Sequence, residues 1–422
     1  ITRAIEEATQ LNLPLLASPV SGGTRMQEGT AAFVQMARIT AAVNAHKDAR
    51  LPYLVYLRHP TTGGVFASWG SLGHINVAQP HALVGFLGPK VYKALHGNDF
   101  PAGVQQSENL YRNGIIDAVL DPRHLRTFLI RMLKVLQSKA GTPAPFASLP
   151  SPAIASTGDT DSWAAVTASR DPRRAGLRSF LRRAATDLVP LSSFAPGNSQ
   201  VVSLSIATIA GQGTVVVGLD RRAAADGTPL GPQALREAQR GMRIASDLGL
   251  PLLAVIDTPG ADLSVEAEEG GLGREIARSL SLLLALRVPT VTLLLGQGAG
   301  GGALALFPAD RIIASSDSWL APLPPEGASA IVHGSTDHAA EMARQQRVGA
   351  AAMLQDGLVD EVVSDSPGAS SNIFFDNAAR AVQQHLGAIA QIDPDMLIKE
   401  RCQRYEVIGA RELDTAQIVP SH

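Results

Sequence analysis

Short apolar runs recur along the chain, and several carry a proline near their start. LPLLA at 13–17 and LPYLVYL at 51–57 have the length and composition of parallel strands that are covered on both faces. The stretch between them predicts a helix, because its apolar residues recur at helical spacing: Phe33, Met36, Ala37, Ile39 and Val43. The pattern therefore predicts strand, helix, strand, glycine turn, helix and strand.

The same unit occurs twice in the chain. LNLPLLASP at 11–19 returns as LGLPLLAVI at 248–256, and LPYLVYL at 51–57 returns as VPTVTLLL from 288, both at an offset of 237 residues. The intervening helix of the second copy is marked by Ile276, Ala277, Leu280 and Leu283. NGIIDAVL at 113–120 matches DGLVDEVV at 356–363, where the offset of 243 is what loop insertions produce. The repeat predicts an α/β fold in two copies, with right-handed crossovers and ligand-binding loops at the carboxyl ends of the strands.

A segment rich in Pro, Ser, Thr and Ala separates the two copies. It predicts a linker at 141–165 between one domain at 1–140 and another at 166–422. The stretch 173–187 then predicts a helix with several arginines: Arg173, Arg174, Arg178, Arg182 and Arg183. Two interpretations stay open for these arginines, a solvated helix face and a docking point for an anionic group.

The second copy has an additional strand pair, VVSLSIATIAG and GTVVVGLD, ahead of a helix near 232–247. The first copy has no room for such a pair, because at the same offset Ile1 corresponds to Ala238. A sheet without its first strands has an exposed edge. We therefore expect the chain to be the remainder of a longer one or to be completed by another chain.

Composition and charge narrow the functional classes. The 422 residues carry a formal net charge of −2, which gives no general attraction to nucleic acid or to an anionic membrane. The single cysteine, Cys402, excludes an intrachain disulfide and any zinc site that needs two thiolates, and favours the cytoplasm. The apolar runs have strand length, which argues against a membrane span, and residues 1–17 lack the pattern of a signal peptide.

Glycine loops follow the apolar strands and carry the candidate chemistry. Gly63-Gly64 in the first copy corresponds to Gly300-Gly301 in the second. Glycine lets the backbone turn sharply and lets a ligand approach backbone N–H groups, and paired N–H donors form an oxyanion hole. Two copies predict two such holes, although the glycines alone would also serve tight packing of strand against helix.

Other kinds of site are less well supported. Residues 296–301 satisfy GxGxxG and are followed by Asp317, as in dinucleotide-binding proteins, but the helix they would open is short. GxSxG is absent, and Ser21 is interpreted as a turn residue. His333 and His338 are five residues apart and are interpreted as surface or turn histidines, so no metal site is predicted. A general base stays possible among the acidic residues near the glycines, Glu28, Glu266, Glu268, Glu269 and Glu326.

These loops carry a family resemblance. SGGTRMQEG, TTGGVFASWG, ALVGFLGPKV, PAGVQQSE and NGIIDAVL resemble the β subunit of bacterial acetyl-CoA carboxylase carboxyltransferase. VIDTPGA, AEEGG, GQGAGGGALA, PPEGAS and KERCQRYEVIGA resemble its α subunit. The resemblance covers about 1–135 and 160–412 and implies fused β-type and α-type domains. It also implies a tandem duplicated ClpP/crotonase-like spiral of ββα units.

The resemblance implies transfer of a carboxyl group from carboxybiotin, held on a biotin carboxyl carrier protein, to the α-carbon of an acyl-CoA. Acetyl-CoA would give malonyl-CoA, and a biotin carboxylase would be a further partner. By resemblance, the oxyanion holes correspond to Gly63 and Gly64 for the thioester enolate and to Gly300 and Gly301 for the biotin urea oxygen. The protein then needs no base of its own, because biotin that has lost its carboxyl group takes the α-proton.

The resemblance also implies where CoA binds and how the chain assembles. CoA is expected along the first copy, and the substrate-binding candidates are Gly22, Gly23, Arg25, Lys90 and Gly260, the two cations facing phosphates. An active site between a β-type and an α-type domain of the assembly implies at least a homodimer. Two alternatives stay open, an acyl-CoA decarboxylase on the same fold and a non-catalytic carboxylase scaffold.

The chain departs from the family pattern at two points. The four-cysteine zinc module of the bacterial β subunit is missing, so it is expected either upstream of Ile1 or lost. The α-type loop often reads GEGGSGG in the family, whereas Gln297, Ala299 and Gly300 stand here in place of Glu, Gly and Ser. A neutral Gln297 changes the local charge on the biotin side.

Overall fold

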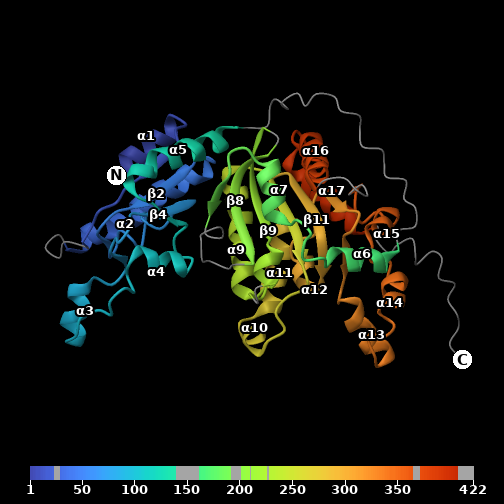
Figure 1. Ribbon diagram of the computed structural model, residues 1–422. Coiled ribbons are helices and arrows are strands. Elements are labelled where there is room, and N and C mark those ends of the chain that lie inside the picture. Colours follow the sequence, from blue (N-terminus) through green and yellow to red (C-terminus); the bar gives the residue numbers. More distant parts are fainter. Residues whose placement is uncertain are drawn as a thin grey trace, which may run out of the picture. The chain divides into compact units, whose positions relative to one another are not determined.

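A computed structural model describes residues 1–22, 29–138, 161–191, 201–209, 211–225, 228–364 and 371–406. The chain divides into two compact units, the first built on Ile1–Leu136 and the second on most of the residues from Gln137 onward. The helices and strands of both units are labelled in Figure 1. Most of the predicted linker lies outside the described residues, and its last part is helical, because helix α6 begins at Ser162. The linker is thus shorter at this end than 141–165.

The first unit contains a parallel sheet of four strands in the order β1-β2-β4-β6. These strands are β1 Leu15–Ala17, β2 Tyr53–Leu57, β4 Ile75–Ala78 and β6 Ala118–Val119, and β3 Thr61–Thr62 pairs separately with β5 Val84–Gly85. The helices are α1 Thr2–Gln10, α2 Gly29–Asp48, α3 Pro89–His96, α4 Ser107–Arg112 and α5 Pro122–Gln137. All five residues of β2 are buried, which explains why its sequence is an unbroken apolar and aromatic run.

The second unit contains a larger sheet that includes the order β14-β12-β11-β10-β9-β8, with β13 paired to β11. Its strands are β8 Val202–Ile209, β9 Gln212–Leu219, β10 Leu252–Thr258, β11 Thr290–Ala299, β12 Arg311–Ser315, β13 Trp319–Ala321 and β14 Glu361–Val363, and β7 Val189–Leu191 precedes them in the chain. Its first helices are α6 Ser162–Ser169, α7 Leu177–Ala184, α8 Arg221–Ala225, α9 Pro232–Leu248, α10 Val265–Glu269 and α11 Leu272–Leu284. The later ones are α12 Gly300–Leu304, α13 Pro325–His333, α14 Ala339–Gln345, α15 Ala350–Gln355, α16 Ser371–Ile389 and α17 Pro394–Glu406.

The predicted duplication is confirmed by the pairing of the strands. Leu15 pairs with Tyr53 in the first unit, and Leu252 pairs with Thr290 in the second, each pair displaced by 237 residues. The parallel order β1-β2-β4-β6 is thereby repeated as β10-β11-β12-β14. The chain is accordingly an α/β protein of two tandem copies, as the apolar pattern predicts.

The repeated Gly-x-x-Asp segments have a structural role in both copies. Asp117 accepts a hydrogen bond from the backbone N–H of Asn76 at 2.6 Å, and Asp360 accepts one from that of Ile312 at 2.7 Å. Each carboxylate therefore fastens the start of the third strand of its copy to the segment that leads into the fourth. The match between NGIIDAVL and DGLVDEVV follows from this shared contact, so it is structural in origin.

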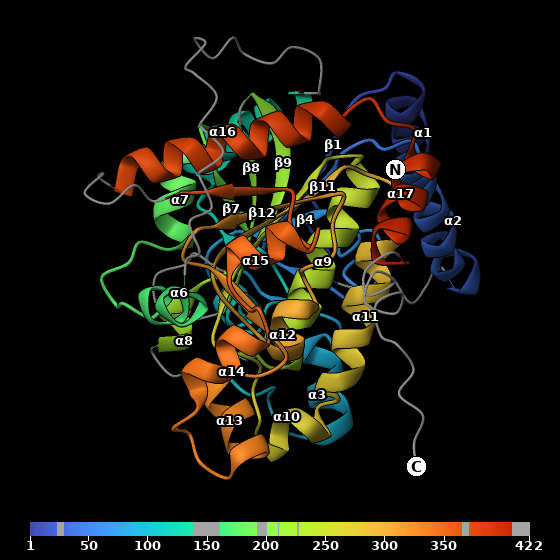
Figure 2. The ribbon, with the colours of Figure 1, turned by 90° about the vertical axis from the view of Figure 1, so that its right-hand side faces the viewer.

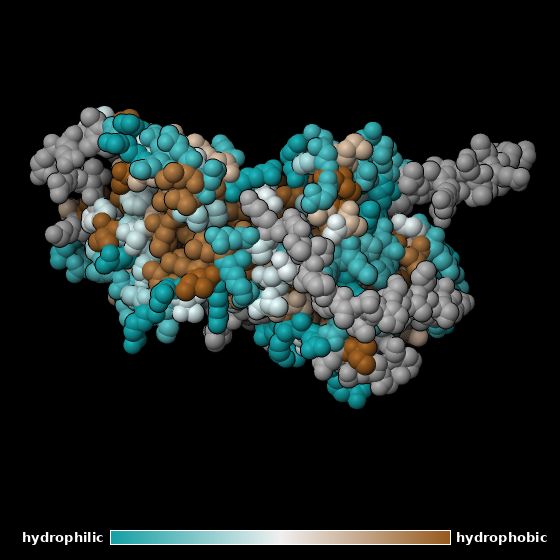
Figure 3. Space-filling view, turned by 90° about the horizontal axis from the view of Figure 1, so that it is seen from above, coloured by the Kyte–Doolittle hydropathy of each residue, from teal (hydrophilic) through white to brown (hydrophobic). Residues whose placement is uncertain are grey.

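Strand β1 lies at the edge of its described sheet, whereas its counterpart β10 lies between β9 and β11. The predicted strand pair ahead of β10 is therefore confirmed as β8 and β9. Leu16 of β1 is 39% exposed, while the equivalent Leu253 is fully buried. Figure 3 shows hydrophobic side chains gathered on the surface of the first unit, on the left of that view. No described helix combines the length and apolar character that crossing a bilayer requires.

The arginine-rich stretch forms a shorter helix than 173–187. Helix α7 begins only at Leu177, after Gly176, and ends at Ala184. Three of its predicted arginines pair with carboxylates of the same chain, in the pairs Arg173–Asp171, Arg178–Asp220 and Arg183–Asp376. These pairs occupy the guanidinium groups, which favours a structural interpretation over a docking point for an external anion.

Arg401 of α17 is almost completely buried. Its guanidinium bonds both carboxylate oxygens of Asp310 at 2.9 Å and donates to the carbonyls of Leu283 and Leu286 at the end of α11. Arg401 thus fastens α17 to the end of α11 and to the start of β12. The C-terminal KERCQRYE segment contributes to the core of the second unit through this residue.

Candidate active site

In both copies the chain at or just after the carboxyl end of the first strand pairs with the residues that lead into the glycine turn. Ser21 forms a parallel bridge with Thr61, and Thr258 pairs with Gly298 at the same offset of 237 residues. The Thr62 N–H donates to the Ser21 carbonyl at 2.8 Å, which fixes this contact in the first copy. The carboxyl ends of neighbouring parallel strands therefore form equivalent candidate sites in the two units.

The glycine pairs adopt the same backbone conformation in both copies. Gly63 has φ +67° and Gly300 has φ +64°, a left-handed conformation that residues with a Cβ rarely adopt. A helical turn follows in each case, since Ala67 N–H donates to the Gly63 carbonyl at 3.0 Å and Ala305 N–H to the Gly301 carbonyl at 2.9 Å. The offset found in the sequence therefore marks two turns of matching geometry.

The second glycine of each pair presents its N–H differently from the first. Gly63 N–H donates to the carbonyls of Gly85 and Phe86 at 3.2 and 3.1 Å, so it is already engaged within the fold. Gly64 N–H has no hydrogen-bond acceptor in the part of the chain that the structure describes. Gly301, as the second residue of α12, belongs to the N-terminal positions whose N–H groups have no partner within a helix. In the described part of the chain, Gly64 and Gly301 are therefore better placed than Gly63 to offer an N–H group to a ligand.

Gly260 also lies beside the glycine turn of the second copy. It has φ +136°, and a Cβ placed on it would lie 3.7 Å from the Cβ of Ala299. Its N–H donates to the Thr258 hydroxyl at 3.2 Å, and that hydroxyl donates to the Gly260 carbonyl at 3.1 Å. The structure thus brings Gly260 beside Ala299, the residue that immediately precedes Gly300 and Gly301.

The substrate-binding candidates of the first copy are only partly described. Gly22 follows Ser21 and has open space where a side chain would point. Lys90 is the second residue of α3, a helix that begins three residues beyond Phe86, although its side chain lies outside the described residues. Gly23 and Arg25 fall within 23–28, which also lie outside them. Gly22 and the start of α3 therefore flank the turn at Gly63.

A buried ion pair that sequence reasoning missed holds the glycine loop of the second copy. Arg174 Nη1 lies 3.1 Å from Asp257 Oδ2, and Arg174 also donates to the Leu295 carbonyl. Asp257 Oδ1 accepts the Gln297 N–H at 3.0 Å. The Asp257 side chain is fully buried, and burial raises its pKa while the Arg174 guanidinium and the Gln297 N–H oppose that rise.

This pair explains part of the glycine content of the loop. A Cβ on Gly296 would lie 2.5 Å from Asp257 Oδ1 and would also overlap the Arg174 guanidinium. In the sequence, the only indication of this ion pair was a single aspartate, Asp257, directly after the apolar run LPLLAVI. Its partner Arg174 was visible only as one of several arginines.

The acidic residues near the glycines are engaged or exposed. Glu326 forms a two-pronged pair with Arg170 at 2.5 and 2.9 Å, and this hydrogen bonding lowers the pKa of Glu326. Glu266, Glu268 and Glu269 are exposed on α10, and Glu28 lies outside the described residues. A carboxylate whose pKa is lowered by a guanidinium is a weak base, so Glu326 is poorly suited to that role.

The dinucleotide alternative does not fit the observed loop. Strand β11 continues to Ala299, so Gly296 and Gly298 lie within a paired strand and not at a strand-to-helix turn. A Cβ on Gly298 would lie 2.7 Å from the Trp319 carbonyl, which accounts for this glycine by close packing. Helix α12, which follows, has five residues. A pyrophosphate site needs its glycines at the turn itself.

Comparisons with known proteins agree with this geometry. Residues 1–388 match the carboxyl transferase domain family. The chain is 52% identical over 411 residues to the probable biotin-dependent acyl-coenzyme A carboxylase beta3 subunit of Mycobacterium tuberculosis, covering 97% of this chain and 82% of that protein. It is 33% identical over 436 residues to the acetyl-coenzyme A carboxylase carboxyl transferase subunits beta/alpha of Saccharopolyspora erythraea, covering 100% of this chain and 76% of that protein.

Solved structures share the fold. The transcarboxylase 12S crystal structure, a hexamer with hydrolysed methylmalonyl-coenzyme A bound, superposes with a TM-score of 0.74 at 20% identity. The superposition covers 92% of this chain and 75% of that one. A single-chain, multi-domain long-chain acyl-CoA carboxylase superposes with a TM-score of 0.68 at 18% identity, over 91% of this chain and 37% of that one. The predicted crotonase-like fold is confirmed.

Proposed function

Because the chain belongs to the carboxyl transferase domain family, we propose that it transfers a carboxyl group from carboxybiotin to the α-carbon of an acyl-CoA. The observation that carries this proposal is the pair of equivalent glycine turns, with φ +67° at Gly63 and +64° at Gly300. A reaction between two carbonyl-containing partners needs two sites that stabilise negative oxygen, and a duplicated turn supplies two. A fold with one such site would suit simple thioester hydrolysis better.

Each turn has a distinct role in the proposed reaction. Gly63 and Gly64 hold the thioester oxygen of the acyl-CoA, which becomes negative when the α-carbon loses a proton and the thioester becomes an enolate. The Gly64 N–H is the donor that is not engaged within the described fold. Gly300 and Gly301 hold the urea oxygen of biotin. Bound carboxybiotin supplies the carboxyl group and the base that removes the α-proton. The polypeptide contributes orientation and electrostatic stabilisation, which is consistent with the absence of a well-placed general base among the described acidic residues.

Acetyl-CoA is the acceptor that we propose, with malonyl-CoA as the product. The Saccharopolyspora relative is named for acetyl-CoA, while the Mycobacterium relative is named for acyl-CoA without a chain length. Gly22, Gly23, Arg25 and Lys90 bind the CoA moiety in this proposal, and Gly260 supports the biotin side. Lys90 lies in the first turn of α3, and Arg25 follows Gly22-Gly23 in the sequence; both are cations that would pair with the phosphate groups of CoA.

The proposed partners follow from the same reaction. A biotin carboxyl carrier protein delivers the biotin, a biotin carboxylase loads it, and at least two copies of the chain assemble. We also propose that residues 1–140 form the acyl-CoA domain of β type and residues 166–422 the biotin domain of α type.

The reverse reaction tests the proposed function directly. Purified chain is incubated with malonyl-CoA and free biotin, and acetyl-CoA formation is followed, with methylmalonyl-CoA in parallel. We expect turnover that depends on biotin and is faster with malonyl-CoA. Faster turnover of methylmalonyl-CoA would contradict acetyl-CoA as the acceptor while supporting the transferase.

Two other outcomes would replace the proposal. CO₂ release from malonyl-CoA at the same rate with and without biotin would indicate a decarboxylase. No turnover of either substrate by a folded, oligomeric sample supplied with its carrier protein would indicate a scaffold subunit. Size-exclusion chromatography on the same sample establishes the oligomeric state.

Glu326→Gln is expected to leave the transfer rate within about threefold of wild type, because its carboxylate is held by Arg170 and does not serve as a base. The loss of the partly exposed ion pair should lower the free energy of unfolding by at most about 1 kcal/mol. Rate and urea denaturation are measured on the same preparation. A loss of rate by a factor of 100 or more in a stable variant would reinstate Glu326 as a catalytic residue.

A further inference from the structure

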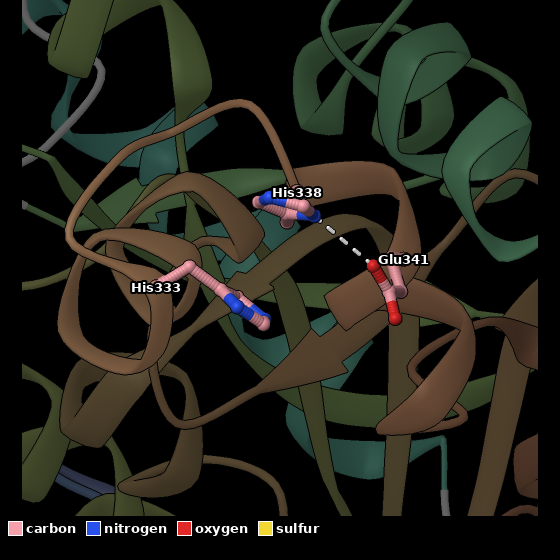
Figure 4. Close-up of side chains that lie close together, drawn as sticks. All are labelled: His333, His338 and Glu341. Carbon is pink, nitrogen blue, oxygen red and sulfur yellow. Dashed lines mark hydrogen bonds and ion pairs between the residues drawn. The ribbon is translucent and has the colours of Figure 1, made fainter.

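Helices α13 and α14 bring together two histidines and a glutamate that no part of the proposed reaction uses. His333 is the last residue of α13, His338 is the residue that precedes α14, and Glu341 lies in the first turn of α14. Figure 4 shows the three side chains grouped around one point, and in Figures 1 and 2 the two helices lie side by side. Both histidines are exposed, in agreement with their interpretation as surface residues, and Glu341 lies beside them.

The potential ligand atoms of these side chains are close. One atom from each residue can be chosen so that all three lie within 4.8 Å of one another. The two imidazole rings have centroids 4.3 Å apart, and His338 Nδ1 lies 3.1 Å from Glu341 Oε2. Around a tetrahedral zinc ion, ligand atoms lie on the order of 3.3 Å apart, given metal–ligand distances of about 2.0–2.2 Å. Rotations of these exposed side chains are sufficient to close the remaining gap.

The backbone that carries the ligands is fixed by a buried hydroxyl. Ser329, which is fully buried in α13, donates from Oγ to the Ser335 carbonyl at 2.6 Å and accepts the His338 N–H at 3.1 Å. Gly334 ends α13 with φ +73°, which turns the chain back toward α14. The short connection is therefore held at both ends, and the two histidines are presented at a fixed separation before any ion arrives.

From this arrangement we propose that His333, His338 and Glu341 bind a divalent transition-metal ion of the zinc type. Two imidazoles and one carboxylate form a known zinc ligand set, with a water molecule completing the tetrahedron. Imidazole ligands disfavour Mg²⁺ and Ca²⁺, which take oxygen ligands. The bound ion would link the end of α13 to the start of α14. This metal site is independent of carboxyl transfer, so a chain that does not bind zinc could still carry out the proposed reaction.

The site has a defined place in the second unit. Helix α13 follows β13, whose Trp319–Ala321 segment pairs with Gln297–Ala299 ahead of the glycine turn. A metal link between α13 and α14 would therefore stiffen α13, the helix that follows β13, and β13 pairs with β11 just ahead of the glycine turn at Gly300.

Titration calorimetry with zinc chloride tests the site on the full chain, after treatment with EDTA and removal of the chelator. We expect one saturable ion per chain and an upward shift of the melting temperature when zinc is present. His333→Ala and His338→Ala should each lose this binding and this shift, and Glu341→Gln should weaken both. His124→Ala serves as the matched control, because His124 is also exposed but lies outside the cluster, and it should bind as wild type does.

Cobalt(II) provides an independent readout that does not depend on stability. The wild-type chain should show the intense visible absorption of tetrahedral cobalt, and the two histidine variants should not. Circular dichroism confirms that the variants are folded. Equal zinc uptake by wild type and both histidine variants, or no saturable uptake by the wild type, would overturn the proposal. Displacement of zinc by millimolar Mg²⁺ would overturn it as well.

Discussion

Gly300→Val is expected to reduce carboxyl transfer by a factor of about 10² to 10³, because it removes one oxyanion donor. Gly300 has φ +64°, a left-handed backbone conformation that costs a residue with a Cβ about 1–2 kcal/mol. A valine at this position is therefore expected to rotate to another φ. That rotation turns the peptide plane between Gly300 and Gly301 and redirects the Gly301 N–H. Gly63→Val should have a comparable effect on the acyl-CoA side, since Gly63 has φ +67°.

A graded series separates conformation from bulk. Asparagine tolerates the left-handed region better than other residues with a Cβ, so Gly300→Asn should retain more activity than Gly300→Val. Gly387→Ala is the matched control, because Gly387 lies in α16 with open space around its missing side chain, and this variant should transfer at the wild-type rate. Equal activity of Gly300→Val and Gly387→Ala in the biotin-dependent assay would refute the donor role.

Gly300 is a better position for this test than Gly301. A Cβ on Gly301 would lie 2.7 Å from Ile276 Cδ1, so a valine there disturbs packing between α12 and α11 in addition to any chemistry. Sequence reasoning treated the two glycines of each pair as equivalent. The structure distinguishes them, since the first sets the turn and the second presents the N–H.

The tandem α/β organisation was predictable because the apolar runs are short, buried on both faces and repeated at a fixed offset. Leu15, Tyr53, Leu252 and Thr290 occupy the positions that the repeat assigns to them. The glycine turns were predictable for the same reason, because a left-handed backbone requires glycine at Gly63 and Gly300 in both copies.

Contacts between segments that are distant in the chain were not predictable. Arg170 reaches Glu326 and Arg401 reaches Asp310 across 156 and 91 residues, and neither pair has a local pattern. The start of α7 was also misplaced, because the arginines from 173 onward fit a helix but Gly176 delays it to Leu177. Pairing of charges depends on the tertiary fold, whereas periodicity depends on the chain alone.

Arg174→Met is expected to lower the free energy of unfolding by about 3–5 kcal/mol, because it leaves the fully buried Asp257 carboxylate without its partner. Native domains are stabilised by about 5–15 kcal/mol, so activity is measured under conditions in which circular dichroism shows the variant folded. The transfer rate should fall about 10- to 100-fold, since Asp257 also holds the Gln297 N–H, and Gln297 precedes the glycine turn by three residues.

Arg173→Met is the control, because the Arg173 side chain is 89% exposed and its pair with Asp171 lies on the surface. This neighbouring arginine carries the same charge in the same segment, so a general loss of positive charge would affect both variants equally. Chemical denaturation should therefore find Arg173→Met close to wild type and Arg174→Met well below it. The double variant Arg174→Met/Asp257→Asn should regain part of the lost stability, since it removes the isolated buried charge together with its partner. Asp257→Asn is therefore also measured alone. If it lowers the free energy of unfolding by the same amount in the Arg174→Met background as in the wild-type chain, the two side chains act independently, and the ion pair does not hold the loop.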